Sequence, residues 1–307
     1  MRALVTGAAG FAGRHLVEHL RASGDEVEAV GHEDGPDLLD AEGWASLVAR
    51  HRPEVLYHLA GQTSVAASWE DPRDTFRVNA EGTLVVLLAA ASAQVGRVLV
   101  VSSSDVYGPV AEDQLPLREE APLRPATPYG ASKAAAEQLC VQAGVGFGLD
   151  VLRARAFNHT GPGQDARFVA AALATRVAEA ERDGRERIVV GNLAARREFT
   201  DVRDVVRAYR LLVQHGAPGG LYNVCSGRDT SIADLAELLV SLSGRPLRLD
   251  VDPALVRPVE VPALRGDAAR LEAATGWRPA IPFEDTLAAL LAEARARVAD
   301  RASPAGR

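Results

Sequence analysis

The chain of 307 residues contains almost no lysine. Of its 34 basic Lys and Arg side chains, 33 are Arg and only Lys133 is Lys. Cysteine is nearly as rare, because Cys140 and Cys225 are the only two. Two cysteines outside any C-x-x-C pair exclude a disulfide framework, so we expect buried thiols in a reducing compartment.

Long apolar runs and a positive net charge are also missing. The most apolar run, residues 83–93, is too short and too rich in alanine to span a bilayer. The net charge of −7 argues against a nucleic-acid or anionic-membrane partner. The opening MRALVTG already has the pattern of a buried strand, which leaves no room for a signal peptide. We therefore expect a cytoplasmic protein, with one large domain or two modest ones.

Short apolar runs alternate with helical patterns through the first half of the chain. The predicted strands cover residues 3–6, 26–30, 55–59, 98–102 and 151–154, and the predicted helices cover 11–23, 41–50, 75–93 and 132–143. Buried strands that alternate with helices indicate a parallel sheet with helices on both faces. The sequence therefore predicts an α/β fold with a Rossmann-type doubly wound parallel sheet.

The stretch TGAAGFAG, residues 6–13, joins the first strand to the first helix. Gly7 permits a tight turn, Gly10 lets the backbone approach a pyrophosphate, and Gly13 lets the helix pack closely. The phosphates would lie at the helix N-terminus, beside Phe11 and Ala12. This position between a strand and a helix predicts a dinucleotide site.

The edge that would hold the adenine ribose is short. The second predicted strand is followed by GHEDGPDLLD, with little or no room for a further strand before Asp37 and Leu38. An acid at the strand tip favours NAD, whereas an Arg favours NADP. Here the tip offers Glu33 and no Arg, although Arg14 is near in sequence. The pattern favours NAD slightly and does not decide between NAD and NADP.

Tyr129 and Lys133 are four residues apart, so on a helix they share one face. An ammonium beside a phenol lowers the pKa of the phenol, which would make Tyr129 a usable general acid or base. Arg is larger and planar, so this role explains the single Lys better than a surface role does. The alternative is an ordinary exposed lysine.

The helix that follows the glycine loop also contains H-x-x-E-H, at His15, Glu18 and His19. Some zinc peptidases use this spacing. No third ligand accompanies it, and the helix is expected to pack on the sheet. We therefore expect no metal.

Together, TGAAGFAG, VSSSDVYG (101–108) and Tyr129-x-x-x-Lys133 resemble the extended short-chain dehydrogenase/reductase family. The resemblance implies a catalytic set of Ser103, Tyr129 and Lys133. It also implies that Asn79 and the HLAG segment contact the cofactor, through Leu59, Ala60 and Gly61. The implied cofactor is NAD(P)H.

Segments of the second half narrow the resemblance to the branch that acts on GDP-mannose derivatives. These segments are FNHTGPGQ (157–164), VGNLAARREFTDVRDVVRAY (190–209), YNVCSG (222–227) and RPVEVPALRGDAARLEAATGW (257–277). The implied activity is reduction of the C4 ketone of GDP-4-dehydro-6-deoxy-D-mannose to GDP-D-rhamnose, a step of deoxysugar biosynthesis. Tyr129 would donate the proton, Lys133 would lower the pKa of Tyr129, and Ser103 would hydrogen-bond the carbonyl oxygen.

The alternatives within the family are a GDP-mannose 4,6-dehydratase and a sugar 4-epimerase. A dehydratase needs a base for the C5 proton, and the family pattern places a Glu two residues after the catalytic hydroxyl. This chain has Asp105 there, one methylene shorter, and such offsets are costly. Asp105 therefore favours the reductase, and a turn-capping role for it is equally open. A different class, a non-catalytic NAD(P)-sensing protein, is disfavoured because Tyr129 and Lys133 are both present.

The resemblance also implies where the GDP-sugar is held. Its matching positions are Ser103, Asp105, Asn158, Val169, Asn192, Arg197, Arg257 and Glu260. The two arginines suit a diphosphate, which arginine binds in bidentate pairs.

The expected layout divides the chain into two units. Residues 1–157 with 197–212 would form the Rossmann domain, and residues 158–196 with 213–307 would form a smaller C-terminal α/β substrate domain. The helices near 75–93 and 132–143 would suit the four-helix homodimer interface common in the family, or could simply pack on their own sheet.

Overall fold

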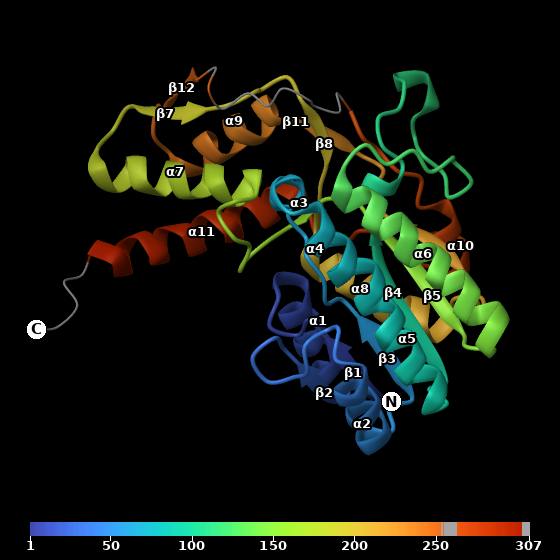
Figure 1. Cartoon of the computed structure of the whole chain (residues 1–307). Helices are drawn as coiled ribbons and strands as arrows, with labels where there is room; N and C mark the ends of the chain where they lie inside the picture. Colours follow the sequence, from blue (N-terminus) through green and yellow to red (C-terminus); the bar gives the residue numbers. More distant parts are fainter. Residues whose placement is uncertain (253, 255–262, 303–307) are drawn as a thin grey trace, which may run out of the picture.

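The computed structural model describes residues 1–252, 254 and 263–302, and its centre is a six-stranded parallel sheet (Figure 1). The strand order is β10-β5-β4-β3-β1-β2. The strands are β1 (Arg2–Thr6), β2 (Glu26–Val30), β3 (Val55–His58), β4 (Arg97–Ser103), β5 (Val151–Ala156) and β10 (Leu221–Val224). The order reverses between β1 and β3, which is where such sheets bind ligands at their carboxyl ends.

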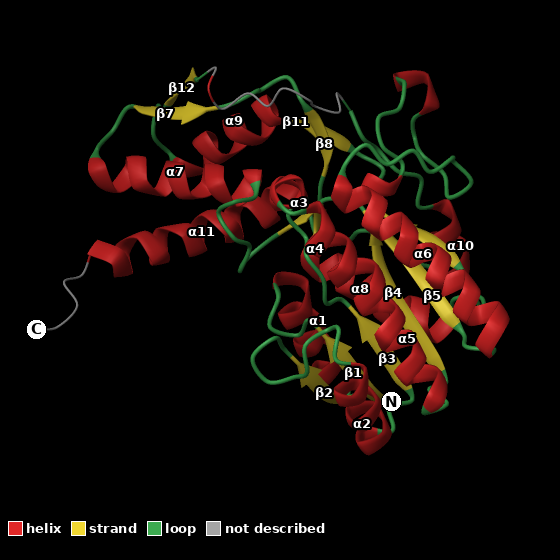
Figure 2. Ribbon diagram, viewed as in Figure 1, coloured by secondary structure: helices red, strands yellow, loops and turns green. Residues whose placement is uncertain are grey.

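Helices cover both faces of this sheet, as the sequence predicts (Figure 2). One face packs against α2 (Ala41–His51), α5 (Gly82–Ser92) and α6 (Pro128–Phe147). The other packs against α1 (Phe11–Ala22), α8 (Val202–His215) and α10 (Ala269–Thr275). Both interfaces consist of buried Leu, Val and Ala side chains, so the sheet has a hydrophobic core on each side.

The predicted helix over 75–93 is not continuous. The chain forms α3 (Val65–Glu70), α4 (Pro72–Phe76), a π-helical turn η1 (Arg77–Glu81) and then α5. Asp71 accepts a hydrogen bond from the Asp74 amide at 2.9 Å and Pro72 stands at the first turn, so this helical segment begins before residue 75. The π turn contains Asn79, which is buried.

The helix that carries Tyr129 also begins earlier than predicted. The Thr127 hydroxyl caps it by accepting from the Gly130 amide at 2.9 Å, and Pro128 stands at its first turn. The helix continues through Gly144 and Gly146 and ends at Gly148, whose φ of 68° is left-handed.

A second group of elements packs around its own core of Ala, Leu, Val and Ile side chains. It comprises α7 (Val169–Asp183), α9 (Ile232–Ser243), α11 (Phe283–Ala302) and the paired strands β7 (Arg187–Val190) and β12 (Arg248–Val251). Figure 1 shows α7 and α11 running side by side away from the sheet. Two short strand pairs complete the second half: β8 (Arg196–Glu198) with β11 (Asp229–Ser231), and β6 (His159–Thr160) with β9 (Thr200–Asp201). Two 3₁₀ turns, η2 (Ser104–Val106) and η3 (Glu112–Gln114), follow β4 in the first half.

The layout differs from the expected one at three places. Helix α8 does return to the sheet, but the strands before it do not join the sheet, because β8 pairs with β11 and β9 pairs with β6. Strand β10 and helix α10, which fall in the range 213–307, belong to the sheet and its core. The sheet edge needs them because Tyr222 and Val224 of β10 and Leu271 of α10 are buried there. Among the described residues, no helix is long and apolar enough to cross a membrane.

Candidate active site

The residues of the predicted catalytic set come together at the carboxyl ends of the strands. Ser103 is the last residue of β4, and Tyr129 and Lys133 occupy the first turns of α6 beside it. All three are buried, with 7 to 8% of their surface exposed. The Lys133 ammonium donates to the Val101 carbonyl at 3.0 Å, which ties α6 to β4. Lys133 is therefore not an ordinary surface lysine.

The ionisation of Tyr129 differs from the predicted direction. Burial raises its pKa above the ordinary value, and the nearby Asp105 carboxylate raises it further, while a side-chain hydrogen bond with Ser103 lowers it. Lys133 is itself buried and directed to Val101, so it does not reverse this effect. Tyr129 thus stays protonated at neutral pH, as a proton donor requires.

Burial also changes Lys133. Removal from water lowers its pKa to about 8, against an opposing effect of Cys140 and Glu137. The ammonium form therefore predominates at neutral pH but is lost in mild base.

Asp105 lies against Ser103. The Ser103 hydroxyl donates to the Asp105 carboxylate at 2.9 Å, and the Asp105 amide donates back to the same hydroxyl at 3.1 Å. Burial raises the pKa of Asp105, and Ser103 and the Arg197 guanidinium lower it in part. The prediction that Asp105 caps the turn is wrong, because the capping side chain is Ser103, which accepts from the Asp105 amide. The Asp105 carboxylate instead accepts from the Ser103 hydroxyl.

The glycine loop has the shape that a pyrophosphate needs. Gly7 has a φ of +69°, and a Cβ there would lie 2.7 Å from the Ala60 amide nitrogen. A Cβ on Gly13 would lie 2.1 Å from the Gly7 carbonyl oxygen, so only glycine permits this packing. Gly10 is the N-cap of α1 and supplies no capping side chain, and the first turn contains no acid. The first amides of α1, at Phe11 and Ala12, therefore have no side-chain acceptor from Gly10, and this arrangement fits a dinucleotide phosphate.

A buried hydrogen-bond chain connects this loop to the middle of the sheet. Thr83 donates its only proton to the Asn79 carbonyl at 2.6 Å, so His58 must donate from Nε2 to Thr83 at 3.1 Å. His58 Nδ1 then accepts from Thr6 at 2.8 Å, and Thr6 accepts from the Ala60 amide at 3.1 Å. Burial, with a smaller effect of Lys133, lowers the pKa of His58 to about 3, so this His is neutral.

The predicted cofactor residues Asn79 and Leu59-Ala60-Gly61 are part of this same region. The Asn79 amide group donates to the Ser132 hydroxyl at 2.9 Å and to the Gln62 carbonyl at 3.0 Å. Ser132 in turn donates to the Tyr129 carbonyl at 2.7 Å. Sequence reasoning missed Thr6, His58, Thr83 and Ser132. Their signal was weak because a polar residue at a strand end or inside an apolar helix has many structural uses.

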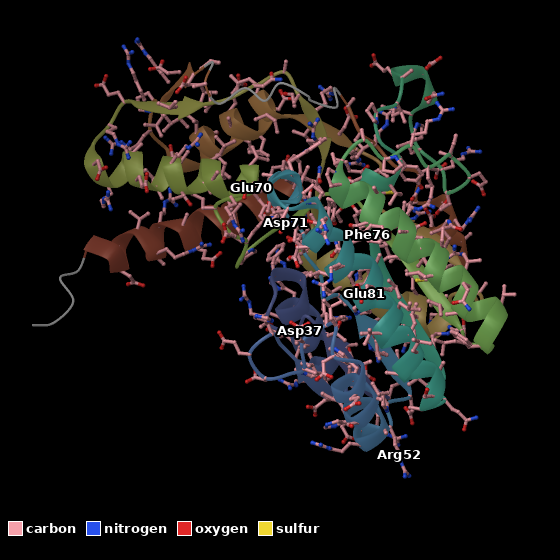
Figure 3. All side chains as sticks on the ribbon, in the orientation of Figure 1. Asp37, Arg52, Glu70, Asp71, Phe76 and Glu81 are labelled. Carbon is pink, nitrogen blue, oxygen red and sulfur yellow. The ribbon has the colours of Figure 1, made fainter. Side chains whose placement is uncertain are left out.

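The expected adenine edge is open. Arg14, Arg21, Gly31 and Asp34 line a hollow of about 480 Å³ between α1 and the tip of β2. Asp37 is exposed, and its side chain accepts from the Leu39 amide at 2.8 Å (Figure 3). Leu38 lies against Gly82 and the core beneath α5. The hollow therefore offers both cationic and acidic groups to a ribose.

The predicted substrate positions lie mainly in the second half of the chain, and they are spread over more elements than the predicted catalytic residues. Asn158 is exposed after β5, Val169 begins α7 and is 39% exposed, and Asn192 follows β7, where it accepts from the Ala194 amide at 2.9 Å. Arg197 on β8 is close enough to lower the pKa of Asp105. Arg257 and Glu260 lie outside the described residues.

The H-x-x-E-H residues make other contacts. His15 Nε2 lies 2.8 Å from the Pro162 carbonyl oxygen, and its ring packs edge-on against Phe11. Phe11 also stacks on His159, with ring centroids 5.8 Å apart. Among the described residues there is no group of three His, Cys, Asp or Glu side chains that could hold a metal ion.

Comparison with known proteins adds a family and several relatives. A family model described as GDP-mannose 4,6 dehydratase matches residues 34–290. GDP-6-deoxy-D-mannose reductase of Pseudomonas aeruginosa is 42% identical over 97% of this chain and 98% of its own length. UDP-glucose 4-epimerase of Mycolicibacterium smegmatis is 33% identical over 94% of this chain and 96% of its own length.

A solved structure shares the fold over nearly the whole chain. It is that of RMD from Pseudomonas aeruginosa complexed with NADPH, which matches with a TM-score of 0.90 and 40% identity. The match covers 97% of this chain and all of the other.

Proposed function

Since this chain belongs to the GDP-mannose 4,6-dehydratase family of extended short-chain dehydrogenase/reductases, we propose that it reduces the C4 ketone of GDP-4-dehydro-6-deoxy-D-mannose to GDP-D-rhamnose. The 42% identity with GDP-6-deoxy-D-mannose reductase supports this substrate. The reductant is a nicotinamide dinucleotide, NADH or NADPH.

The observation that carries this proposal is that Ser103, Tyr129 and Lys133, all buried, come together at the carboxyl ends of the strands. The bound reduced dinucleotide supplies hydride to C4. Tyr129 donates a hydrogen bond to the ketone oxygen and gives its proton as that oxygen becomes an alkoxide. Ser103, whose one proton goes to Asp105 in the free protein, would turn that proton to the same oxygen when the substrate binds. Lys133 supplies positive charge beside the dinucleotide ribose.

The position of Asp105 also favours the reductase over the dehydratase. Its carboxylate accepts from Ser103, the hydroxyl that would face the ketone, and its short side chain is held at that contact. A C5 base has to reach a carbon beyond the carbonyl, whereas a ketone reductase needs no such base. We assign Asp105 to holding the Ser103 hydroxyl until the substrate binds and to the sugar side of the site.

The GDP moiety would be held by the second half. Arg197 is close enough to Asp105 to lower the pKa of its carboxyl group. Together with Arg257 it would bind the diphosphate. Asn158, Val169, Asn192 and Glu260 complete the proposed substrate contacts. The substrate would thus lie between the carboxyl edge of the sheet and the elements around α7 and β8.

The hollow beside β2 contains groups that suit NADPH and groups that suit NADH. Arg14 and Arg21 could bind a 2′-phosphate, whereas Asp34 could accept from a free 2′-hydroxyl. The 40% identical structure carries NADPH.

We propose a homodimer through α4, α5 and α6. Phe76, Leu88, Val141 and Val145 on these helices are 40 to 86% exposed. Figure 3 shows Phe76 and Glu81 along the face that α4 and α5 present. A pairing of two α5–α6 faces would cover the apolar residues in a four-helix interface. Leu88→Asp should yield a monomer by sedimentation, and an unchanged dimer would refute this interface.

The decisive experiment mixes the purified protein with enzymatically prepared GDP-4-dehydro-6-deoxy-D-mannose and follows the absorbance of NADH and NADPH in parallel. Stoichiometric oxidation of the cofactor, with a product two hydrogens heavier that NMR identifies as GDP-D-rhamnose, is the expected result. GDP-mannose alone is the control. Loss of water from GDP-mannose without net cofactor oxidation would identify a dehydratase in which Asp105 is the base.

A further inference from the structure

An ion pair lies beneath the site, withdrawn from water. The Arg155 guanidinium on β5 donates to both oxygens of the Glu137 carboxylate on α6, at 2.9 Å from Nε and 2.7 Å from Nη2. The two residues are only 3% and 1% exposed. Glu137 stands four residues after Lys133, so Tyr129, Lys133 and Glu137 form one stripe along α6.

The pair connects the segments that carry the reacting groups. The Ser102 hydroxyl, next to Ser103, donates to Glu137 at 2.6 Å. In the sheet, Ser102 is the register partner of Arg155. The remaining Arg155 nitrogen donates to the Tyr107 hydroxyl at 2.9 Å and to the Glu119 carbonyl at 3.0 Å.

Tyr107 extends the same network to the edge strand. Its hydroxyl donates to the Asn223 side chain on β10 at 2.6 Å, and its ring lies under the Arg155 guanidinium at 4.7 Å. Tyr107 closes the 3₁₀ turn that carries Asp105. One ion pair therefore contacts α6, the end of β4, and the turn after it.

We propose that Glu137 and Arg155 are positioning residues that hold the Tyr129–Lys133 helix at a fixed distance from the Ser103 strand end. This inference rests on the proposed ketone reduction. Two contacts fix α6 to β4, Lys133 with Val101 and Glu137 with Ser102, and the guanidinium fixes Glu137. Without the carboxylate, α6 keeps its apolar packing but loses the contact that sets Tyr129 relative to Ser103.

The chain offers a matched control at the other end of the same two strands. Arg97, which begins β4, pairs with Asp150, just before β5, at 2.6 Å. This pair is about 20% exposed, and it joins the amino ends of the strands, far along β4 and β5 from Ser103. Asp150→Asn breaks an Arg–carboxylate pair between the same strands without touching the site.

The activity test compares Glu137→Gln with Asp150→Asn. Glu137→Gln should lower kcat about tenfold to hundredfold with less than about twofold change in KM, because misplacement by about an ångström has effects of this size. Asp150→Asn should keep kcat and KM while lowering the unfolding midpoint. An unchanged kcat in Glu137→Gln, or an equal loss in Asp150→Asn, would overturn the proposal.

A double variant covers the case in which a buried guanidinium left alone prevents folding. Glu137→Gln with Arg155→Met removes both charges. Its kcat should be reduced about as much as in Glu137→Gln alone, because residues that act as one unit are not additive. A folded double variant with full kcat would refute the positioning role.

The single lysine permits a readout that needs no substrate. Label carried on the lysine ε-carbon gives one NMR signal from Lys133, whose pH titration reports its ionisation directly. The charged or titratable groups around it are Glu137 and Cys140 on α6, His58 on β3, Asp105 facing Tyr129, and Arg155 bound to Glu137.

Because Glu137 raises the pKa of Lys133, Glu137→Gln should move the titration midpoint from near 8 to lower pH, by about half a unit or more. Asp150→Asn should leave it unchanged. No shift in Glu137→Gln would overturn the proposal. If the unaltered protein reduced no ketone, the proposed function would fail, while this titration would still decide whether the Glu137 carboxylate lies near enough to Lys133 to act on its ionisation.

Discussion

The two edges of the central sheet treat ionisable groups in opposite ways. At the amino edge, carboxylates have cationic partners: Asp25 binds the chain's N-terminus at 3.0 Å and Arg210 at 2.8 Å, and Asp150 binds Arg97. At the carboxyl edge, Lys133 and Tyr129 are buried and Asp105 is half-buried, and among the described residues none of them belongs to an ion pair.

The pKa shifts follow this difference. Burial alone would raise the pKa of Asp25, but Arg210 and the N-terminus outweigh it and lower that pKa. At the carboxyl edge burial is the dominant cause, so the pKa of Tyr129 and Asp105 rises and that of Lys133 falls. One edge uses paired charges to stabilise the fold, and at the other edge burial disfavours the charged forms of all three groups.

The largest test of this contrast is Tyr129→Phe. Removal of the proposed proton donor should lower kcat about 100-fold to 10,000-fold, the range of general acid catalysis, with the affinity for GDP little changed. Tyr209→Phe is the matched control, because Tyr209 lies close enough to Tyr129 for Tyr129 to raise its pKa and, among the described residues, its buried hydroxyl has no partner. Near-full turnover by Tyr129→Phe would remove Tyr129 from the mechanism.

Lys133→Arg should have the next largest effect, a loss of about 100-fold in kcat, because the buried space holds an ammonium and not a planar guanidinium. The pH profile sharpens the test. Unaltered protein should lose activity as pH rises through about 8, as Lys133 gives up its proton. The arginine variant should lack this decline, since guanidinium stays protonated. If Lys133→Arg leaves kcat and its pH profile unchanged, the single lysine has no chemical role.

Sequence reasoning predicted the local backbone well where one residue type meets a strict backbone demand. The predicted turn of the glycine loop is confirmed by the positive φ of Gly7. The predicted close packing is confirmed at Gly13, where a Cβ would lie only 2.1 Å from the Gly7 carbonyl oxygen. Ser103 lies at the carboxyl end of β4, where such sheets bind ligands, and Tyr129 lies beside it in the first turn of α6. The direction of the Tyr129 pKa was wrong, because the i, i+4 spacing gives proximity to Lys133 but not the burial that dominates.

Long-range partners could not be predicted from local pattern. Nothing near Glu137 in sequence identifies Arg155 as its partner, since the pair depends on which strand lies beside β4. The same holds for the break at Arg77–Glu81, where tertiary contacts of Asn79 with Gln62 and Ser132 accompany a π turn in an otherwise good helical sequence.

A smaller effect is expected from Gly10→Ala. The new Cβ would lie 3.1 Å from the Gly7 carbonyl oxygen, so the free protein needs only a slight adjustment. A methyl group in the proposed phosphate cradle should nevertheless raise the Kd for the dinucleotide about tenfold, measured by calorimetry. Gly144→Ala, inside α6 with its Cβ 3.5 Å from the Leu149 carbonyl oxygen, should leave the Kd unchanged. Equal Kd values for Gly10→Ala and the unaltered protein would contradict the phosphate assignment.

The smallest expected effect is on the free energy of unfolding. The ionised Lys133 lowers this free energy at the carboxyl edge, whereas the ionised Asp25 raises it at the amino edge. Because the folded pKa of Lys133 lies near 8 and its ordinary value is 10.5, burial of the ammonium destabilises the protein fully below pH 8. That destabilisation is lost as pH rises from about 8 to 10.5. Asp25, with a lowered pKa, stabilises the protein above its ordinary range and loses this effect on acidification.

Lys133→Met should therefore be inactive yet more stable than the unaltered protein at neutral pH, by on the order of 1–3 kcal/mol after loss of the Val101 hydrogen bond. Denaturant unfolding at about pH 6 and about pH 10 measures this, and the advantage should shrink at the higher pH. An advantage that stayed constant between the two would mean that the ammonium is not what burial penalises. A shrinking one would show that the carboxyl edge gives up stability to keep one lysine out of water.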